Sequence, residues 1–170
     1  MGVMSTAVVF EQPGEMALRP VQLPEPHSTD CVVEVHWTGI STGTERLLWD
    51  GRMPPFPGLA YPLVPGYESV GCIASSGPEA GLEVGQRVFV PGSRGFTDVQ
   101  GLFGGAARSL VVPAERLIPL PSELDSTGVL LALAATACHA LRRMEDLGAP
   151  ELIIGHGALG RLLALSLIHI

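Results

Sequence analysis

A glycine-rich turn near the carboxyl end most constrains what this chain can fold into. The apolar run Glu151–Ile154 is followed at once by the segment 155–160, which reads GHGALG, and then by an apolar segment of helical character. A strand, a GxGxxG turn and a helix in this order are typical of a fold that binds a dinucleotide. We expect Gly155 to form the tight turn, Gly157 to let the backbone approach a pyrophosphate, and Gly160 to let the helix pack closely on the strand.

The same turn can also be a glycine-rich loop that binds no ligand, and the surrounding pattern favours the binding interpretation because the helix would present its free N–H groups to a phosphate. The acidic residue that usually binds the ribose, about 20 positions further on, would fall after Ile170. The sequence therefore does not distinguish NAD from NADP. One strand and one helix cannot make a nucleotide site, so we expect residues 125–170 to form only the start of a Rossmann domain, inactive alone.

Residues 1–124 show a different sequence pattern, in which short apolar runs rich in β-forming residues are separated by glycine and proline. Such runs predict a small antiparallel β-barrel, so the predicted fold class is mixed α/β, with a barrel domain over 1–124. The expected strands are Thr6–Phe10, Cys31–Trp37, Val70–Ala74, Arg87–Val90, Ser109–Val112 and Leu117–Leu120.

Two further helices are expected. Thr42 precedes Glu45 by three positions in the segment 41–49, which is a capping-box pattern and predicts a short helix that ends at Gly51. A longer helix is predicted over Val129–Leu147, with a cap at Asp125 or Ser126 and a stop at Gly148.

Composition excludes several classes of protein. The net charge is −7 with only 10 Lys and Arg, and no basic run exists, so nucleic acid is not an expected partner. No apolar run approaches the roughly 20 residues of a membrane span. The three cysteines, Cys31, Cys72 and Cys138, lie far apart and form no CxxC pair. They are typical of reduced thiols in a cytoplasmic protein and do not indicate a structural zinc site.

The order of barrel, long helix, strand and GxGxxG resembles the medium-chain dehydrogenase/reductase family, whose catalytic domain is GroES-like. Three shorter segments strengthen the resemblance: Gly66–Gly71 (GYESVG) is similar to the family's GHExxG, Gly85–Val88 (GQRV) to its GDxV turn, and Thr136–Leu141 (TACHAL) to its TAxxAL run. The resemblance implies a nicotinamide cofactor. It adds Thr136 and Leu159 to the three glycines as cofactor-binding residues.

The zinc ligands of that family have no counterparts in this sequence. The cysteine position is occupied by Thr42, or by Ser41 if the register is counted from Gly39. The histidine of GHE is Tyr67, and the third position falls on Ala132. Hydroxyl and methyl groups do not replace a thiolate and an imidazole around Zn²⁺. We therefore expect no catalytic metal.

A narrower resemblance covers Gly39–Gly71, which is similar to family members that oxidise the 1-hydroxyethyl group of a bacteriochlorophyllide, a chlorin, to acetyl with NAD. The resemblance implies that chlorin as substrate, a role in bacteriochlorophyll biosynthesis, and a homodimer for the full-length enzyme. Two alternatives remain open: a zinc-free quinone or enoyl reductase of the same family, and a GroES-like binding module without catalysis.

Three residues are the predicted catalytic groups. Tyr67 is expected to orient or polarise the substrate oxygen, Thr44 to pass the proton on, and Glu68 to act behind them. Each also has a structural interpretation: Thr44 as a helix cap, Tyr67 as a half-buried aromatic, and Glu68 as the ion-pair partner of Arg46 or Arg87.

The predicted substrate-binding residues are two arginines and two aromatic residues. The arginines would bind a propionate carboxylate, and the aromatic rings would form walls for a flat macrocycle, with Phe103 beside them. The alternative is that these apolar loops only pack on the barrel. The four residues are Arg46, Arg52, Phe56 and Phe96.

Overall fold

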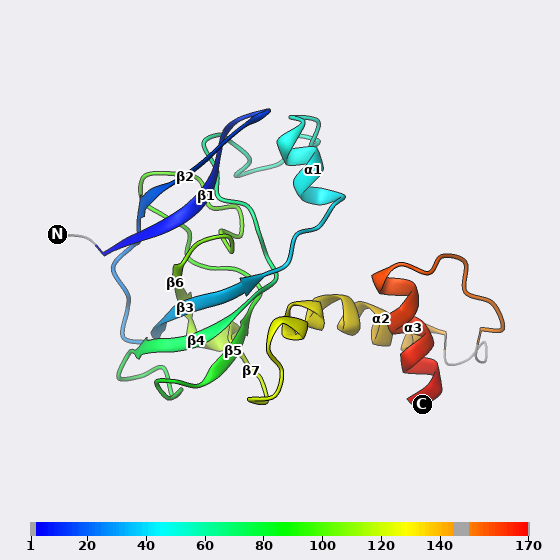
Figure 1. Cartoon of the computed structure of the whole chain (residues 1–170). Coiled ribbons are helices and arrows are strands. Elements are labelled where there is room, and N and C mark those ends of the chain that lie inside the picture. Colours follow the sequence, from blue (N-terminus) through cyan, green and yellow to red (C-terminus); the bar gives the residue numbers. More distant parts are fainter. Residues whose placement is uncertain (1–2, 145–149, 170) are drawn as a thin grey trace. The chain divides into compact units, whose positions relative to one another are not determined.

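The computed structural model describes residues 3–144 and 150–169, and the chain forms two compact units, Met1–Val129 and Leu130–Ile170. In the described residues all strands belong to the first unit, which also contains the short helix α1 (Thr44–Trp49). The second unit contains two helices, α2 (Leu131–Arg143) and α3 (Ala158–His169) (Figure 1).

The first unit begins with an antiparallel hairpin of β1 (Met4–Gln12) and β2 (Glu15–Gln22). β1 alternates in burial, with Ala7 and Val9 completely buried, because successive side chains of a strand point to opposite faces. β2 was not expected from the sequence. It is mostly exposed and contains Pro20, so it lacks the alternation that marks a half-buried strand.

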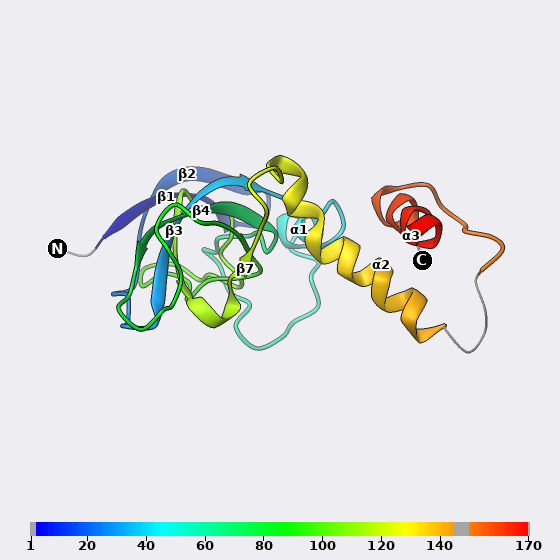
Figure 2. The same cartoon turned by 90° about the horizontal axis from the view of Figure 1, so that it is seen from below.

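A five-stranded antiparallel sheet forms the rest of the barrel, in the order β6-β3-β4-β5-β7. Backbone hydrogen bonds join the hairpin to the segments that precede β6 and β4, from Val8 N to Ala106 O at 2.9 Å and from Phe10 N to Leu63 O at 2.8 Å. Both views show the hairpin against one side of the sheet (Figures 1 and 2). The strand bounds are β3 Asp30–Thr38, β4 Ser69–Ser76, β5 Arg87–Val90, β6 Ser109–Pro113 and β7 Ile118–Pro119. All six expected strands are therefore present; β5 has the expected bounds, and the other five differ at one or both ends.

The core of the barrel is aliphatic, as the short Val, Ile and Leu runs require. Fully buried side chains from β3, β4, β5 and β6 meet in one cluster that also includes β1 residues. Burial of this apolar surface is the main force that closes the barrel, at roughly 25 cal/mol per Å².

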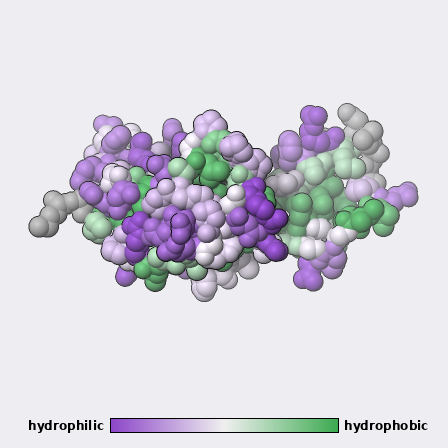
Figure 3. All heavy atoms as spheres, turned by 90° about the horizontal axis from the view of Figure 1, so that it is seen from above, coloured by the Kyte–Doolittle hydropathy of each residue, from purple (hydrophilic) through white to green (hydrophobic). Residues whose placement is uncertain are grey.

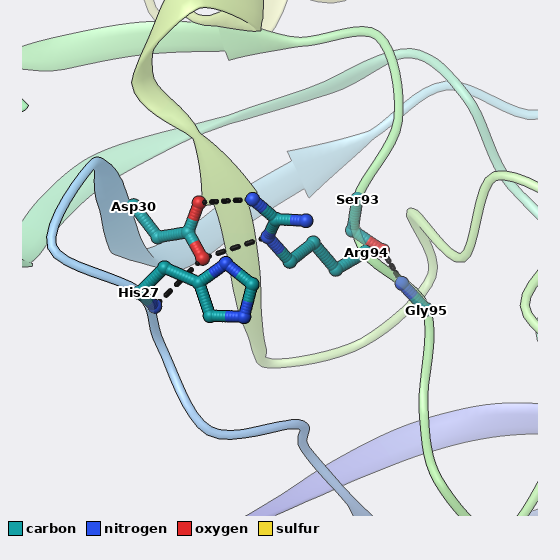
Figure 4. Close-up of polar contacts among 5 residues, drawn as sticks. All are labelled: His27, Asp30, Ser93, Arg94 and Gly95. Carbon is teal, nitrogen blue, oxygen red and sulfur yellow. Dashed lines mark hydrogen bonds and ion pairs between the residues drawn. The ribbon is translucent and has the colours of Figure 1, made fainter.

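One ion pair in this unit joins a completely buried carboxylate to a partly exposed arginine. Arg94 binds Asp30 through two hydrogen bonds, Nε to Oδ2 at 2.7 Å and Nη2 to Oδ1 at 2.9 Å, and the His27 backbone N–H donates to Oδ2 at 2.9 Å (Figure 4). The Asp30 side chain is completely buried. The hydrogen bonds from Arg94, helped by that of His27, hold the pKa of Asp30 below its ordinary value against the opposing effect of burial. The pair ties the start of β3 to the loop after β5.

The second unit is a pair of packed helices. The 3₁₀ turn Ser126–Leu130 leads into α2, whose Ala137 and Leu141 are buried. Arg142 and Arg143 lie in its last turn, where a cation opposes the negative end of the helix dipole, as expected. The predicted stop at Leu147–Gly148 lies outside the described residues. Hydrophobic residues dominate the face of this unit seen in Figure 3.

The expected strand at 151–154 is not formed, and this prediction is wrong for the chain as it stands. Leu152 and Ile154 are 75% and 93% exposed, and no strand is assigned there. A strand exists only where a neighbour accepts its backbone hydrogen bonds, and the described residues of this unit offer none. The helix expected after the glycine turn is present as α3, and it begins at Ala158, inside the turn 155–160.

None of the helices in the described residues is both long and apolar enough to cross a lipid bilayer.

Candidate functional site

Two segments that are distant in the sequence lie against each other at the edge of the barrel. Residues 39–43 lead from β3 into α1, and residues 65–68 precede β4. The Gly39 N–H donates to Glu68 O at 2.7 Å, which joins the two segments through their backbones. A side chain on Gly39 would collide with Glu68, since its Cβ would lie 2.8 Å from Glu68 Oε2. The absence of a side chain there allows the close approach.

These segments bring together two of the predicted catalytic residues. The Tyr67 hydroxyl donates to Thr44 Oγ1 at 3.3 Å, and both residues are half-buried. The Tyr67 ring also packs edge-on against Phe103, with 5.7 Å between ring centroids. The result is a pair of hydroxyl groups with an aromatic neighbour. Each hydroxyl can accept one hydrogen bond while it donates another, as a proton relay requires.

Two carboxyl groups are buried in the same place. Glu68, the third predicted catalytic residue, is 8% exposed, and Glu45 of α1 is 7% exposed. Burial raises the pKa of Glu68 above its ordinary value. Burial also raises the pKa of Glu45, with a hydrogen bond from the Ser41 N–H acting against it and the charge of Glu68 acting with it. The alternative interpretation of Glu68 as an ion-pair partner is wrong, because Arg46 binds Asp50 and Arg87 binds Asp125.

The cap of α1 differs from the expected one. The Ser41 N–H donates to the Glu45 carboxylate, and the Thr44 N–H donates to Ser41 Oγ at 3.3 Å. Ser41 and Glu45 therefore form the reciprocal cap that was expected from Thr42 and Glu45. The Thr42 side chain is exposed. The helix itself starts at Thr44, and its N-cap residue, Gly43, makes no side-chain cap bond, so Ser41 and Glu45 close the loop that leads into α1.

The predicted substrate residues are not gathered into one cluster. Arg46 and Arg52 both bind Asp50, at 3.7 Å and 2.7 Å, and remain largely exposed. Phe56 is 39% exposed. Phe96 packs against the barrel core, and Phe103 is the ring that contacts Tyr67.

A pocket of about 540 Å³ within the first unit is lined by Glu45, but none of the three predicted catalytic residues is among its lining residues. Its walls are mostly apolar and include Phe10 of β1, Met16 of β2 and Trp49 of α1, with Glu45 as a buried acidic group. Of the predicted substrate residues only Arg46 lines it. The contribution of β1 and β2 had no signal in the sequence, because neither strand carries a recognisable site motif.

The residues at the family's zinc positions do not fit a zinc ion. Thr42 and Tyr67 offer neutral hydroxyls, and the Tyr67 hydroxyl is already bound to Thr44. Ala132 has no donor atom on its side chain. Across 3–144 and 150–169 there is no group of three or more His, Cys, Asp and Glu side chains that could hold a metal ion. One carboxylate does not bind Zn²⁺.

The glycine turn has the backbone that the motif requires. Gly155 has φ of +105°, a conformation that a residue with a side chain rarely adopts. A Cβ on Gly160 would lie 2.2 Å from Gly155 O, so the first turn of α3 packs directly on the loop. No atom lies within 4 Å of the corresponding Cβ position at Gly157. This open side and the free N–H groups of α3 suit a pyrophosphate.

The two other predicted cofactor residues lie in the helices of the second unit. Thr136 is exposed on α2 and its hydroxyl donates to Ala132 O at 2.9 Å. Leu159 lies in the first turn of α3 and is 39% exposed.

A GroES-like barrel followed by the opening of a dinucleotide-binding fold is therefore the class that this architecture defines. The model of the alcohol dehydrogenase GroES-like domain family matches residues 27–122. The chain belongs to this family, the medium-chain dehydrogenases.

Two curated relatives share about half of the aligned residues. The chain is 52% identical over 165 residues to the 2-desacetyl-2-hydroxyethyl bacteriochlorophyllide A dehydrogenase of Cereibacter sphaeroides. It is 49% identical over 158 residues to the protein of that name from Rhodobacter capsulatus. The alignments cover 94% and 92% of this chain but 52% and 50% of the relatives. The chain spans about half the length of the curated relatives it matches.

Solved structures show the same fold at lower identity. The D-arabinose dehydrogenase of Sulfolobus solfataricus superposes with a TM-score of 0.77 at 20% identity, covering 98% of this chain and 57% of that one. A structure described as CAD from Helicobacter pylori complexed with NADP(H) has a TM-score of 0.79 at 16% identity, covering 99% and 57%.

Proposed function

We propose that this chain is the catalytic part of a zinc-independent dehydrogenase that oxidises the 1-hydroxyethyl group of a bacteriochlorophyllide to acetyl, with NAD as hydride acceptor. The observation that carries the proposal is the 52% identity to the Cereibacter sphaeroides dehydrogenase, which extends over 94% of the chain. The Tyr67–Thr44 hydroxyl pair supplies the acid-base groups that such a reaction needs. A cytoplasmic location and a homodimeric full-length enzyme belong to the same proposal.

Oxidation of a secondary alcohol requires a hydride acceptor and a proton acceptor. The nicotinamide ring supplies the first when it is bound. For the second, the Tyr67 oxygen accepts a hydrogen bond from the substrate hydroxyl, while the Tyr67 hydroxyl donates to Thr44 Oγ1. The phenol thus orients the reacting oxygen and takes up its proton as the phenol proton moves to Thr44 Oγ1, and Thr44 passes its own hydroxyl proton on to solvent. Phe103 holds the Tyr67 ring in place.

The residues at the zinc positions of the family lack the donor atoms that would bind a zinc ion, so zinc does not polarise the substrate oxygen in this proposal. We therefore assign the orientation of that oxygen to Tyr67, in the position where zinc-dependent members of the family have a ligand histidine. No step of the proposed reaction passes through a metal.

The residues of the glycine turn would hold the cofactor. Gly157 gives the pyrophosphate access to the backbone, and the first N–H groups of α3 would donate to it. We propose that the 170-residue chain alone binds no nicotinamide cofactor specifically, because one turn supplies only one wall of a dinucleotide site.

The test is a chimera in which this chain continues after Ala164 with the matching remainder of the Cereibacter sphaeroides relative, called the completed chimera below. We expect it to oxidise the 1-hydroxyethyl chlorin with NAD and to form the acetyl product, which changes the visible spectrum of the macrocycle. The 170-residue chain under the same conditions is the control and should be inactive.

Two results would contradict the proposal, and each would favour a different function. Reduction of quinones or enones by the completed chimera, without turnover of the chlorin alcohol, would indicate a reductase of the same family. Binding of the chlorin without any turnover would indicate a binding module.

A further inference from the structure

The pocket of about 540 Å³ in the first unit lies where the β1–β2 hairpin meets α1 and the loop 39–42. Its apolar walls come mainly from Phe10, Met16 and Trp49, and all of its lining residues belong to that unit. Ligand pockets in proteins have volumes of roughly 300–1,000 Å³ and mostly apolar walls. This pocket therefore has the size and the lining of a site for a small apolar molecule.

The hairpin wall and the helix wall of the pocket are fastened to each other. The rings of Phe10 and Trp49 pack edge-on, with 5.7 Å between their centroids. The Gly14 N–H, in the turn of the hairpin, donates to Trp49 O at 2.8 Å. Figure 1 shows the turn of the hairpin beside α1. These contacts form the cavity before a ligand enters, so binding requires little further ordering of the walls.

Exposed apolar side chains extend the pocket onto the surface. Met16 lines it from the hairpin and is 58% exposed, and Ile40 lines it from the loop and is 76% exposed. Leu18 is the cross-strand partner of Val8, which lines the pocket, and such partners point to the same face of a hairpin. Leu18 is 74% exposed and continues the apolar wall. An apolar rim of this kind suits a molecule that is wider than the cavity.

One cation lies at this pocket. Among the lining residues that the structure describes, Arg46 is the only Lys or Arg. Its side chain is 75% exposed, and its Nε lies 3.7 Å from Asp50 Oδ2, which is a loose contact. The acidic lining residue, Glu45, already accepts the Ser41 N–H. The Arg46 guanidinium is therefore available to bind a carboxylate at the edge of an apolar ligand.

We propose that this pocket binds the body of the chlorin macrocycle, with the β1–β2 hairpin as the wall that determines specificity for it. Phe10, Met16 and Trp49 pack against the flat ring, because aromatic rings and thioethers make favourable contacts with π systems. Arg46 binds a propionate carboxylate of the ring. The inference rests on the proposed function, which supplies the substrate, and it gives a role to a hairpin that carries no site motif.

The pocket borders both segments that carry the hydroxyl pair, although the pair does not line it. Gly66 lines the pocket directly before Tyr67 in the sequence, and Glu45 lines it directly after Thr44. The residues that recognise the macrocycle are therefore distinct from those assigned to proton transfer. Changes in the hairpin should weaken substrate binding and leave the chemical step unaltered.

Binding can be measured on the 170-residue chain, since its first unit contains all the lining residues. The fluorescence anisotropy of the 1-hydroxyethyl chlorin should rise as it binds. Met16→Asp and Ile40→Asp each place a charge on the apolar wall and should weaken binding about tenfold. Both side chains are exposed, so the fold should be preserved. Val84→Asp, at an apolar position that is 66% exposed outside the pocket, is the matched control and should leave the affinity unchanged.

The role of Arg46 can be tested with two forms of the ligand. Arg46→Gln should weaken binding of the chlorin acid about fivefold, near the upper end for an exposed ion pair. It should leave binding of the propionate methyl ester unchanged. Arg52→Gln is the matched control, because Arg52 binds the same Asp50 without lining the pocket. Equal weakening of acid and ester in Arg46→Gln would overturn the assignment of the carboxylate to this residue.

The outcomes separate this inference from the proposed function. In the completed chimera, Met16→Asp should raise KM and leave kcat unchanged. Turnover by the chimera, with unchanged chlorin affinity in Met16→Asp and Ile40→Asp, would overturn the pocket and leave the proposed function standing. Pocket-dependent binding without turnover would count against the proposed function alone.

Two further results would also overturn the inference. One is the absence of any chlorin binding to the 170-residue chain, because the pocket is complete there. The other is displacement of the chlorin by an equal concentration of laurate, which would assign the pocket to a linear apolar carboxylate. We expect laurate to compete only weakly, since a single chain does not cover the broad apolar rim.

Discussion

The Tyr67 hydroxyl donates to Thr44 Oγ1 at 3.3 Å, and this contact joins the start of α1 to the segment before β4. Zinc-dependent members of the family have a zinc-binding histidine at the position of Tyr67. They have a hydroxyl residue that faces the substrate at the position of Thr44. The contact places two hydrogen-bonded hydroxyl groups at those positions, which we propose to act as an acid-base pair without a metal.

Loss of the phenol should slow the reaction without unfolding the protein. In the completed chimera we expect Tyr67→Phe to lower kcat for the chlorin alcohol about 100-fold, because the substrate oxygen loses its hydrogen-bonding partner. The matched control is Tyr61→Phe. Tyr61 donates to Leu48 O, so this variant should lose about 1 kcal/mol of stability and keep its kcat. An unchanged kcat in Tyr67→Phe would remove the phenol from the mechanism.

Zinc should be dispensable. We expect metal analysis of the purified completed chimera to find zinc far below one ion per chain, and treatment with a chelator to leave the rate unchanged. The reason is the donor set, in which Thr42, Tyr67 and Ala132 replace the ligands. Stoichiometric zinc that is lost together with activity would contradict this.

Substitutions of two glycines of the turn should have different effects, one on cofactor binding and one on the fold. Gly157→Ala meets open space in the chain, so the fold should be preserved, while NAD binding by the completed chimera should weaken about tenfold, or about 1.4 kcal/mol. Gly160→Ala places a Cβ 2.2 Å from Gly155 O and should disturb the turn even without cofactor. Titration calorimetry and circular dichroism distinguish the two effects. Wild-type affinity in Gly157→Ala would mean that the pyrophosphate does not approach this residue.

The Asp30–Arg94 ion pair should make the stability of the barrel depend on pH. The folded-state pKa of Asp30 is lowered, so the pair stabilises the fold above the unfolded value of about 3.9, and this contribution is lost as the pH falls through the folded pKa. Arg94→Met leaves the buried Asp30 carboxylate with only the His27 N–H as partner and without a cation, and should cost about 3 kcal/mol at neutral pH.

Urea unfolding at several pH values measures this dependence. The difference between wild type and Arg94→Met should shrink as the solution becomes acidic, because Asp30 is then protonated in both. Arg108→Met removes the exposed pair with Glu34, at 3.6 Å, and should change stability by less than about 0.5 kcal/mol. A constant difference across the pH range would mean that Asp30 is not the group responsible.

Several elements were predictable because their signals are local. The runs that form β3, β4, β5 and β6 carry enough apolar residues between glycine and proline breaks to mark strands. The motifs at 66–71 and 155–160 identified the family, which the matching domain at 27–122 confirms. β2 had no such signal, since an exposed edge of a hairpin needs no apolar alternation.

The sequence by itself determined the residue types at the site: hydroxyls where zinc ligands would be, a glutamate after Tyr67, and three glycines at turn spacing. Only the tertiary structure decided which of them meet. The Tyr67–Thr44 bond, the hydrogen bond from the Gly39 N–H to Glu68 O and the pocket wall from β1 and β2 all join segments that are far apart in the chain. The strand expected at 151–154 shows the same limit, because its formation depends on neighbours and its own residues do not suffice. Local spacing sets what a segment can form, and contacts between distant segments set which of these possibilities the protein realises.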